Sequence, residues 1–255
     1  MSAGPLHGRV ALVTGAGRGI GAAAAERLAG DGAQVVAVAR SVDELRELER
    51  RTGASWIAAD LAAPDACERV IAETLERFGA LDVLVNNAGL GSTGEGRVWE
   101  LDPRRWRAAF ALNLDAPFAL TRLALPGMIE RRFGRVVMVA SLAAVRGGVA
   151  PGMGAYASSK HGLLGLMRAV AVEVAPLGLT CNAVLPGSVR TQTAELKVAE
   201  EAAAAGTSIE QAWQARAQRT TGGRLVEAGE CAAAIAFLAS PEASAINGQA
   251  LSVTL

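Results

Sequence analysis

Short apolar runs rich in β-branched residues alternate with longer segments of mixed polar and apolar character. Runs of this kind are typical of strands that are buried on both faces of a sheet. They predict strands near 9–14, 33–39, 55–59, 81–86, 134–140, 178–184 and 249–253. The segments between them predict helices near 19–30, 43–51, 65–78, 103–131 (in one or two pieces), 155–175 and 227–239. The alternation predicts an α/β fold: a doubly wound, Rossmann-like parallel sheet of about seven strands flanked by helices.

No linker or repeat interrupts this pattern, so we expect residues 1–255 to form a single Rossmann-like domain. The stretch Gln192–Gly223 is the one insertion-like region. Its composition predicts two short helices, Glu195–Ala205 and Ile209–Arg219.

A glycine-dense turn follows the first predicted strand. Gly15, Gly19 and Gly21 have the spacing G-x-x-x-G-x-G, and Ile20 stands where the G-x-G-x-x-G fingerprint has its third glycine. Gly15 permits a tight turn, Gly19 lets the backbone approach a pyrophosphate, and Gly21 lets the helix pack closely on the strand. The segment predicts a dinucleotide-binding turn, with an ordinary strand–helix turn as the alternative.

Two arginines stand where the cofactor's adenosine ribose would be recognised. NAD-binding sites place a carboxylate after the second strand, but here Arg40 follows that strand, and the first acid, Asp43, is expected to cap the next helix. Arg40 and Arg18 offer guanidinium groups suited to a phosphate. They predict NADP(H) in preference to NAD(H), although either arginine alone could be a solvated surface residue.

Tyr156 and Lys160 lie four residues apart in Y-A-S-S-K, which places them on one face of a helix. An ammonium group beside a phenol favours the phenolate, so we expect the pKa of Tyr156 to be lowered. Such a phenol can exchange a proton with a carbonyl or alcohol oxygen near neutral pH.

Three motifs in this order, T-G-x-x-x-G-I-G, N-N-A-G at 86–89 and Y-A-S-S-K, resemble those of the short-chain dehydrogenase/reductase family, in its shorter single-domain branch. The resemblance runs from about Val10 to Val253. It implies an oxidoreductase that transfers a hydride between NADP(H) and a carbonyl or secondary alcohol, such as a ketone reductase or a 3-oxoacyl reductase.

The resemblance also implies individual roles. Asn113 would hold a water in a proton relay, Ser141 would bond the substrate oxygen, and Tyr156 and Lys160 would complete the catalytic set. The cofactor-binding residues would be Gly15, Arg18, Gly19, Ile20, Gly21, Arg40, Asp60, Leu61, Asn87, Ala88, Gly89, Tyr156, Lys160, Pro186, Gly187, Val189 and Thr191. Asn113 could instead tie two backbone segments together, Ser141 could cap a strand, and Asp60 could be a turn residue. No metal is implied.

In the family, the segment near 190–223 forms a substrate lid. Leu196, Trp213 and Ala217 could face a substrate or simply pack on the core. Arg216 or Arg219 could meet an anionic tail, although solvated helix arginines are the favoured reading. The chain departs from the family in two places. The segment before Tyr156 is longer by about two residues, within 147–154, and the chain stops at Leu255, so the contacts of its C-terminus are not predicted.

The composition places limits on partners and location. The 25 basic and 25 acidic residues balance, so no general attraction to nucleic acid or anionic membranes is expected. Three cysteines, an N-terminus without an apolar signal core and the expected absence of a membrane-spanning run favour the cytoplasm. The resemblance implies a homo-oligomer, with a tetramer favoured and a dimer possible, joined through the long helices near 103–131 and 155–175.

Two other classes of protein are alternatives to this interpretation. A catalytically silent dinucleotide-binding regulator would be expected to have lost Tyr156, Lys160 or Ser141, and all three are present. An epimerase or dehydratase of the family's longer branch would need a larger C-terminal substrate domain than 255 residues leave room for.

Overall fold

The computed structural model describes residues 4–91, 96–145 and 151–255, with the backbone alone at 193, 196 and 197. Seven parallel strands form one sheet in the order β3-β2-β1-β4-β5-β6-β9. The strands are β1 (Val10–Thr14), β2 (Gln34–Ala39), β3 (Ser55–Ala58), β4 (Val83–Asn86), β5 (Arg135–Val139), β6 (Thr180–Pro186) and β9 (Ala250–Val253). Strand order reverses between β1 and β4, so the predicted doubly wound sheet is confirmed.

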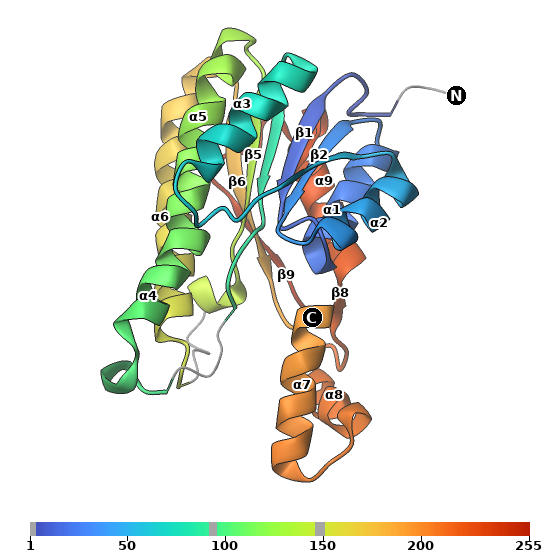
Figure 1. Ribbon diagram of the computed structural model, residues 1–255, viewed down its shortest axis with the longest axis vertical. Helices are drawn as coiled ribbons and strands as arrows, with labels where there is room; N and C mark the ends of the chain where they lie inside the picture. The colour runs from blue at the N-terminus through green and yellow to red at the C-terminus, as the bar shows by residue number, and fades with distance from the viewer. Residues whose placement is uncertain (1–3, 92–95, 146–150) are drawn as a thin grey trace.

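Helices cover both faces of the sheet (Figure 1). One layer contains α1 (Gly19–Gly30), α2 (Val42–Thr52) and α9 (Ala228–Ala239). The other contains α3 (Ala66–Phe78), α5 (Ala116–Glu130) and α6 (Gly154–Val174). The N-cap of α2 is Ser41, whose hydroxyl accepts a hydrogen bond from Glu44 N, so the expectation that Asp43 caps this helix was wrong.

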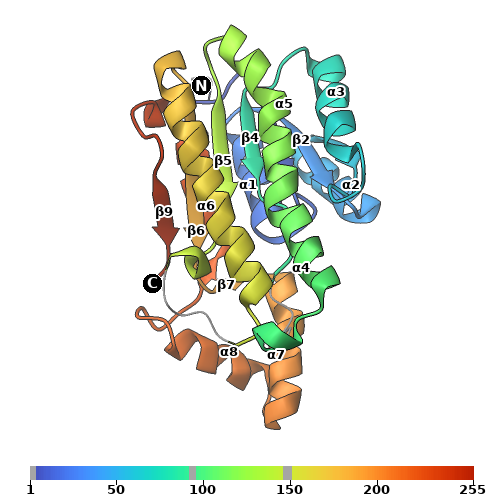
Figure 2. The same cartoon turned by 90° about the vertical axis from the view of Figure 1, so that its left-hand side faces the viewer.

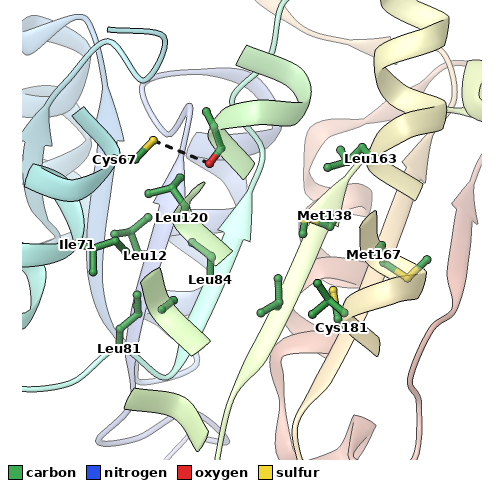
Figure 3. Close-up of a cluster of buried hydrophobic side chains, with 14 of the residues drawn as sticks. Leu12, Cys67, Ile71, Leu81, Leu84, Leu120, Met138, Leu163, Met167 and Cys181 are labelled. Carbon is green, nitrogen blue, oxygen red and sulfur yellow. Dashed lines mark hydrogen bonds between the residues drawn. The ribbon is translucent and has the colours of Figure 1, made fainter. Parts of the chain in front are cut away.

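The strands are apolar on both faces because each face is buried under a helix layer. Within β1, Val10 and Leu12 face the α3/α5/α6 layer, whereas Ala11 and Val13 face the α1/α2/α9 layer. Figure 3 shows part of the first cluster, with Leu12, Leu84 and Leu120 close together. Fully burying one such leucine contributes roughly 1.5–3 kcal/mol, so these two layers hold the sheet rigid beneath its loops.

A single helical run from Pro103 to Glu130 comprises α4 (Pro103–Phe110), a π-helical turn (Ala111–Asp115) and α5. By length and composition alone, this run could cross a membrane, which the sequence analysis did not expect. Leu120, Ala124 and Met128 of this run pack in the core against the sheet. Figure 2 shows α4 and α5 running along the sheet beside α6.

Beyond the carboxyl ends of the strands, α7 (Gln192–Ala205) and α8 (Ile209–Gln218) extend away from the sheet (Figures 1 and 2). Two short strands, β7 (Val189–Arg190) and β8 (Val226–Glu227), pair at the base of these two helices, which are named the lid after the role that the family resemblance implies for them. Within it, Trp213 packs with Val198 and Leu225, and Ala217 lies against that cluster. Trp213 therefore packs mainly inside the lid, while the side chain of Leu196 lies outside the described residues.

Candidate active site

A cavity of about 790 Å³ opens at the carboxyl edge of the sheet, where β1 and β4 lie side by side. Open α/β sheets bind ligands at this switch point. With the exception of Gly21, every residue expected to bind the cofactor lines this cavity. Ser141, Tyr156 and Lys160 line it as well, whereas Asn113 is fully buried behind the wall.

The glycine loop is shaped as a cradle that side chains would fill. Gly15 has φ +64°, and a Cβ there would lie 2.8 Å from Asn87 Nδ2 and 2.9 Å from Ala88 Cα. A Cβ on Gly21 would lie 2.2 Å from the Gly15 carbonyl oxygen, so Gly21 serves the close packing of α1 instead of lining the cavity. The loop leads directly into the N-terminus of α1, a geometry that fits a pyrophosphate.

Thr14 ties the glycine loop to the N-N-A-G segment. Its hydroxyl accepts hydrogen bonds from Asn87 N (2.9 Å) and Ala88 N (3.0 Å) and donates to Val85 O (3.2 Å). The amide of Asn87 donates to Thr14 O at 2.8 Å. These bonds fix one wall of the cavity relative to the other, which preorganises the site for a ligand that spans both.

At the far end of the cavity, Arg18 and Arg40 both line the wall. Arg18 Nη1 lies 3.6 Å from the carboxylate of Glu44, which lines the same wall. The sequence did not indicate Glu44, because this acid does not directly follow β2 but reaches the cavity from the first turn of α2. Asp60 lines the cavity and also accepts a hydrogen bond from Ala62 N, as a turn residue does.

Four further expected cofactor residues lie at the end of β6 and just after it: Pro186, Gly187, Val189 and Thr191. Gly187 N donates to Val253 O at 2.9 Å, and a Cβ on Gly187 would lie 2.8 Å from Thr254 Oγ1, so the final strand fixes this loop. Thr191 caps α7 by accepting from Ala194 N. Its Cγ2 would lie 3.4 Å from a Cβ on Gly19, which brings the first residue of the lid against the glycine loop.

Ser141 and Tyr156 form the polar centre of the cavity. Ser141 follows β5, and Tyr156 projects from the first turn of α6; the Ser141 hydroxyl acts to lower the pKa of the Tyr156 phenol, which places the two groups near each other. Ser141 Oγ also accepts from Ala143 N at 3.1 Å, which caps a short 3₁₀ turn and fixes the side chain. The two hydroxyl groups can therefore act on one substrate oxygen.

Lys160 lies one turn after Tyr156 and is only 4% exposed. Its Nζ donates to Val139 O at 2.8 Å, and burial lowers the pKa of this ammonium from 10.5 to about 8. Burial raises the pKa of Tyr156, although the Ser141 hydrogen bond acts in the opposite direction. The expected lowering of the Tyr156 pKa was therefore wrong in net direction, because desolvation of the phenolate exceeds the favourable interactions within the protein.

Asn113 lies in the π-helical turn, and its amide is fully occupied. Its Oδ1 accepts from Leu90 N (2.7 Å), while its Nδ2 donates to Leu90 O (3.0 Å) and to Ser159 Oγ (2.9 Å). It thus ties two backbone segments together, which was the structural alternative for this residue. A Cβ on Gly89 would lie 2.9 Å from Asn113 Oδ1 and 3.3 Å from Lys160 Nζ, so Gly89 allows these side chains to approach each other.

Only part of the long segment before Tyr156 falls within the described residues. Residues 146–150 lie outside the described part of the chain, so the expected extra length is not placed. Met153 does line the cavity beside Tyr156. From the lid, Ala194 and Arg216 reach the same cavity, whereas Arg219 does not line it. Arg216 is held by an ion pair with Glu201 (2.6 Å).

Residues 15–254 match the family model described as enoyl-(acyl carrier protein) reductase. A 3-oxoacyl-(acyl-carrier-protein) reductase of Vibrio cholerae is 36% identical over 97% of this chain and 96% of its own. A putative ketoacyl reductase of Streptomyces coelicolor is 38% identical over 96% and 95% of the two chains. The structure of an actinorhodin polyketide ketoreductase variant with NADPH superposes with a TM-score of 0.90, at 36% identity over 99% and 98%.

Proposed function

The chain belongs to the short-chain dehydrogenase/reductase family, whose members act on carbonyl and alcohol groups, and we propose that it reduces a ketone, of the 3-oxoacyl class, with NADP(H). One observation carries the proposal. Ser141, Tyr156 and the buried Lys160 line one cavity that continues to the glycine loop, and the Ser141 hydroxyl is near enough to the Tyr156 phenol to influence its pKa. Two hydroxyl donors converging on one point suit a carbonyl oxygen that gains negative charge.

The residues present fit a dinucleotide with a 2′-phosphate. The cradle at Gly15 and Gly19 would hold the pyrophosphate, and Arg18 and Arg40 would face the phosphate on the adenosine ribose. The loop from Pro186 to Thr191 would hold the nicotinamide end. When bound, NADPH supplies the hydride, and the protein supplies position and electrostatics.

In this proposal, the Tyr156 hydroxyl donates its proton to the substrate oxygen during reduction. A phenol whose pKa is raised stays protonated at neutral pH, which suits a proton donor. Ser141 donates a hydrogen bond to the same oxygen. Because the pKa of Lys160 is about 8, this side chain is mostly charged at pH 7 and stabilises negative charge left on Tyr156. Asn113 holds the wall at Leu90 in place.

The substrate class rests on the relatives, which are named as reductases of 3-oxoacyl or ketoacyl groups.

We also propose a homotetramer in the cytoplasm. Support for the assembly comes from Phe118 on α5 and Val172 on α6, which are 52% and 76% exposed on the helices expected to join subunits. Large exposed apolar residues on neighbouring helices are typical of surfaces that another subunit covers.

The proposal is tested by measuring NADPH and NADH oxidation against 3-oxoacyl thioesters, diketones, simple ketones, sugars and steroids. Turnover of 3-oxoacyl thioesters with NADPH is expected. Tyr156→Phe removes only the hydroxyl, so kcat should fall at least about 10³-fold while the Kd for NADPH changes less than about threefold. Normal turnover in this variant would disprove the role of Tyr156, and preference for another substrate group would correct the substrate class.

A further inference from the structure

An acidic side chain stands in the arginine-lined end of the cavity. We propose that Glu44 limits the preference for NADP(H) over NAD(H), because its carboxylate competes with the 2′-phosphate for Arg18. This inference rests on the proposed function, since it refines how the same cofactor site selects between two dinucleotides. It names a determinant of selectivity that lies outside the loop after β2.

The position of Glu44 is fixed by the start of α2. Glu44 is the third residue of the helix, and its backbone N–H donates to the hydroxyl of the N-cap residue Ser41 at 3.3 Å. From there the side chain bends back over the glycine loop, and a Cβ on Gly17 would lie 2.4 Å from Glu44 Oε2. The Glu44 side chain is 34% exposed, and Glu44 lines the cavity. The acid thus belongs to the wall that a ribose phosphate would approach.

The two arginines of this wall are in different states. Arg18 is paired with Glu44 at 3.6 Å. Arg40 is exposed, and within the described ranges 4–91, 96–145 and 151–255 no ion pair involves it. A 2′-phosphate could therefore use Arg40 directly, whereas it has to share Arg18 with Glu44 or draw that guanidinium away from it. Until then the phosphate also meets the negative charge of Glu44 at close range.

The carboxylate of Glu44 has the opposite effect on a ribose that lacks the 2′-phosphate. Its 2′-hydroxyl is uncharged and can donate a hydrogen bond to a carboxylate. Glu44 therefore penalises the phosphorylated ribose and tolerates or supports the free one. Asp60 lines the same cavity, but it is unchanged in the variants that test Glu44. Its electrostatic effect on binding is therefore the same in each protein and cancels when their affinities are compared.

The test uses adenosine 2′,5′-bisphosphate and 5′-AMP, which differ by the 2′-phosphate alone, with affinities measured by calorimetry on the full chain. In Glu44→Gln the bisphosphate should bind about 3- to 10-fold more tightly at low salt, while 5′-AMP binds equally or slightly more weakly. The gain should shrink at about 0.5 M salt, because the partly exposed carboxylate is screened. NADPH and NADH should show the same change in their affinity ratio.

Asp43→Asn provides the matched control. Asp43 precedes Glu44 in the same helical turn, is exposed and does not line the cavity, so this variant loses the same charge without opening Arg18. Its bisphosphate affinity should change less than about twofold. Equal unfolding midpoints would show that both variants keep α2 intact.

An unchanged ratio of the two affinities in Glu44→Gln, or an equal shift in Asp43→Asn, would overturn the inference. If the unmodified protein does not prefer the bisphosphate but Glu44→Gln does, then Glu44 suppresses phosphate binding as inferred, and the proposed NADP(H) selection is wrong. If the unmodified protein prefers the bisphosphate and Glu44→Gln changes nothing, the selection stands and the role of Glu44 is refuted.

Discussion

Replacing Lys160 with methionine should stabilise the ligand-free protein at neutral pH while removing a residue that the proposed chemistry needs. Burial lowers the pKa of Lys160 from 10.5 to about 8. At 1.36 kcal/mol per pH unit, holding this ammonium charged in the folded protein at pH 7 costs about 3 kcal/mol. Methionine fills a similar volume without a charge, so Lys160→Met relieves that cost.

The same substitution loses the hydrogen bond from Lys160 Nζ to Val139 O. A buried carbonyl that loses its partner costs about 1–2 kcal/mol. The net effect at pH 7 is therefore a gain of about 1–2 kcal/mol in the free energy of unfolding of the variant. Most buried-site substitutions destabilise, so a gain here would be specific to the desolvated charge.

The pH dependence separates this cause from ordinary repacking. The folded pKa of Lys160 lies below the unfolded one, so the unfolded chain binds more protons between pH 8 and 10.5. The stability of the unmodified protein therefore rises relative to the variant as pH increases through this window. Near pH 10.5 the cost of charge has gone and only the lost hydrogen bond remains, so the variant should be less stable by about 1–2 kcal/mol.

Urea unfolding followed by circular dichroism at pH 7, 8.5 and 10, at equal protein concentration and without cofactor, measures the difference between the two proteins. The raised pKa of Tyr156 influences both proteins in the same direction, so its contribution cancels to first order. The expected result is a stability difference that changes sign between pH 7 and about 10. A difference that stays constant with pH, or a variant already less stable at pH 7, would refute the reasoning about Lys160.

Two further predictions concern the cofactor end and the wall behind the site. Arg40→Asp should weaken NADPH binding about 10- to 100-fold and change NADH binding less than about threefold, as measured by fluorescence titration. An unchanged ratio of the NADPH and NADH affinities would mean that Arg40 does not contact the phosphate. Asn113→Ala leaves Leu90 and Ser159 without their buried partner, so urea unfolding should show a loss of about 3–5 kcal/mol; a loss below about 1 kcal/mol would contradict the structural tie.

The regular part of the fold could be predicted because its signals are local. Apolar runs and the glycine-to-helix transition placed the seven main strands, and α1 begins at the predicted residue Gly19. The strands β7 and β8 were not predicted, since each has only two residues and their pairing joins positions 37 residues apart. The π-helical turn at Ala111–Asp115 was missed for a different reason: its local sequence does not distinguish it from the α-helices on either side.

Residues of the site could be predicted where a sequence motif specifies both a residue and its spacing from the residue beside it in space. Tyr156 and Lys160 meet the cavity because one helical turn separates them, whatever surrounds the helix. Glu44 could not be found in that way, because it lies at the cavity only as a result of how α2 packs against the glycine loop, which no local sequence motif specifies. The direction of the Tyr156 pKa was also out of reach, since it depends on how deeply the phenol is buried and not on which residue lies four positions away.

The buried ammonium connects the fold to the proposed chemistry. An isolated charge at the position of Lys160 is unfavourable. The protein tolerates it because two apolar layers stabilise the interior strand β5, whose last residue, Val139, accepts the hydrogen bond from Lys160. That stability permits a lysine whose pKa of about 8 is close to physiological pH, so its charge responds to a change on Tyr156. A rigid sheet beneath the site is therefore a requirement for the charged lysine, and the glycine at position 89 is a second one, since any side chain there would crowd Lys160 and Asn113.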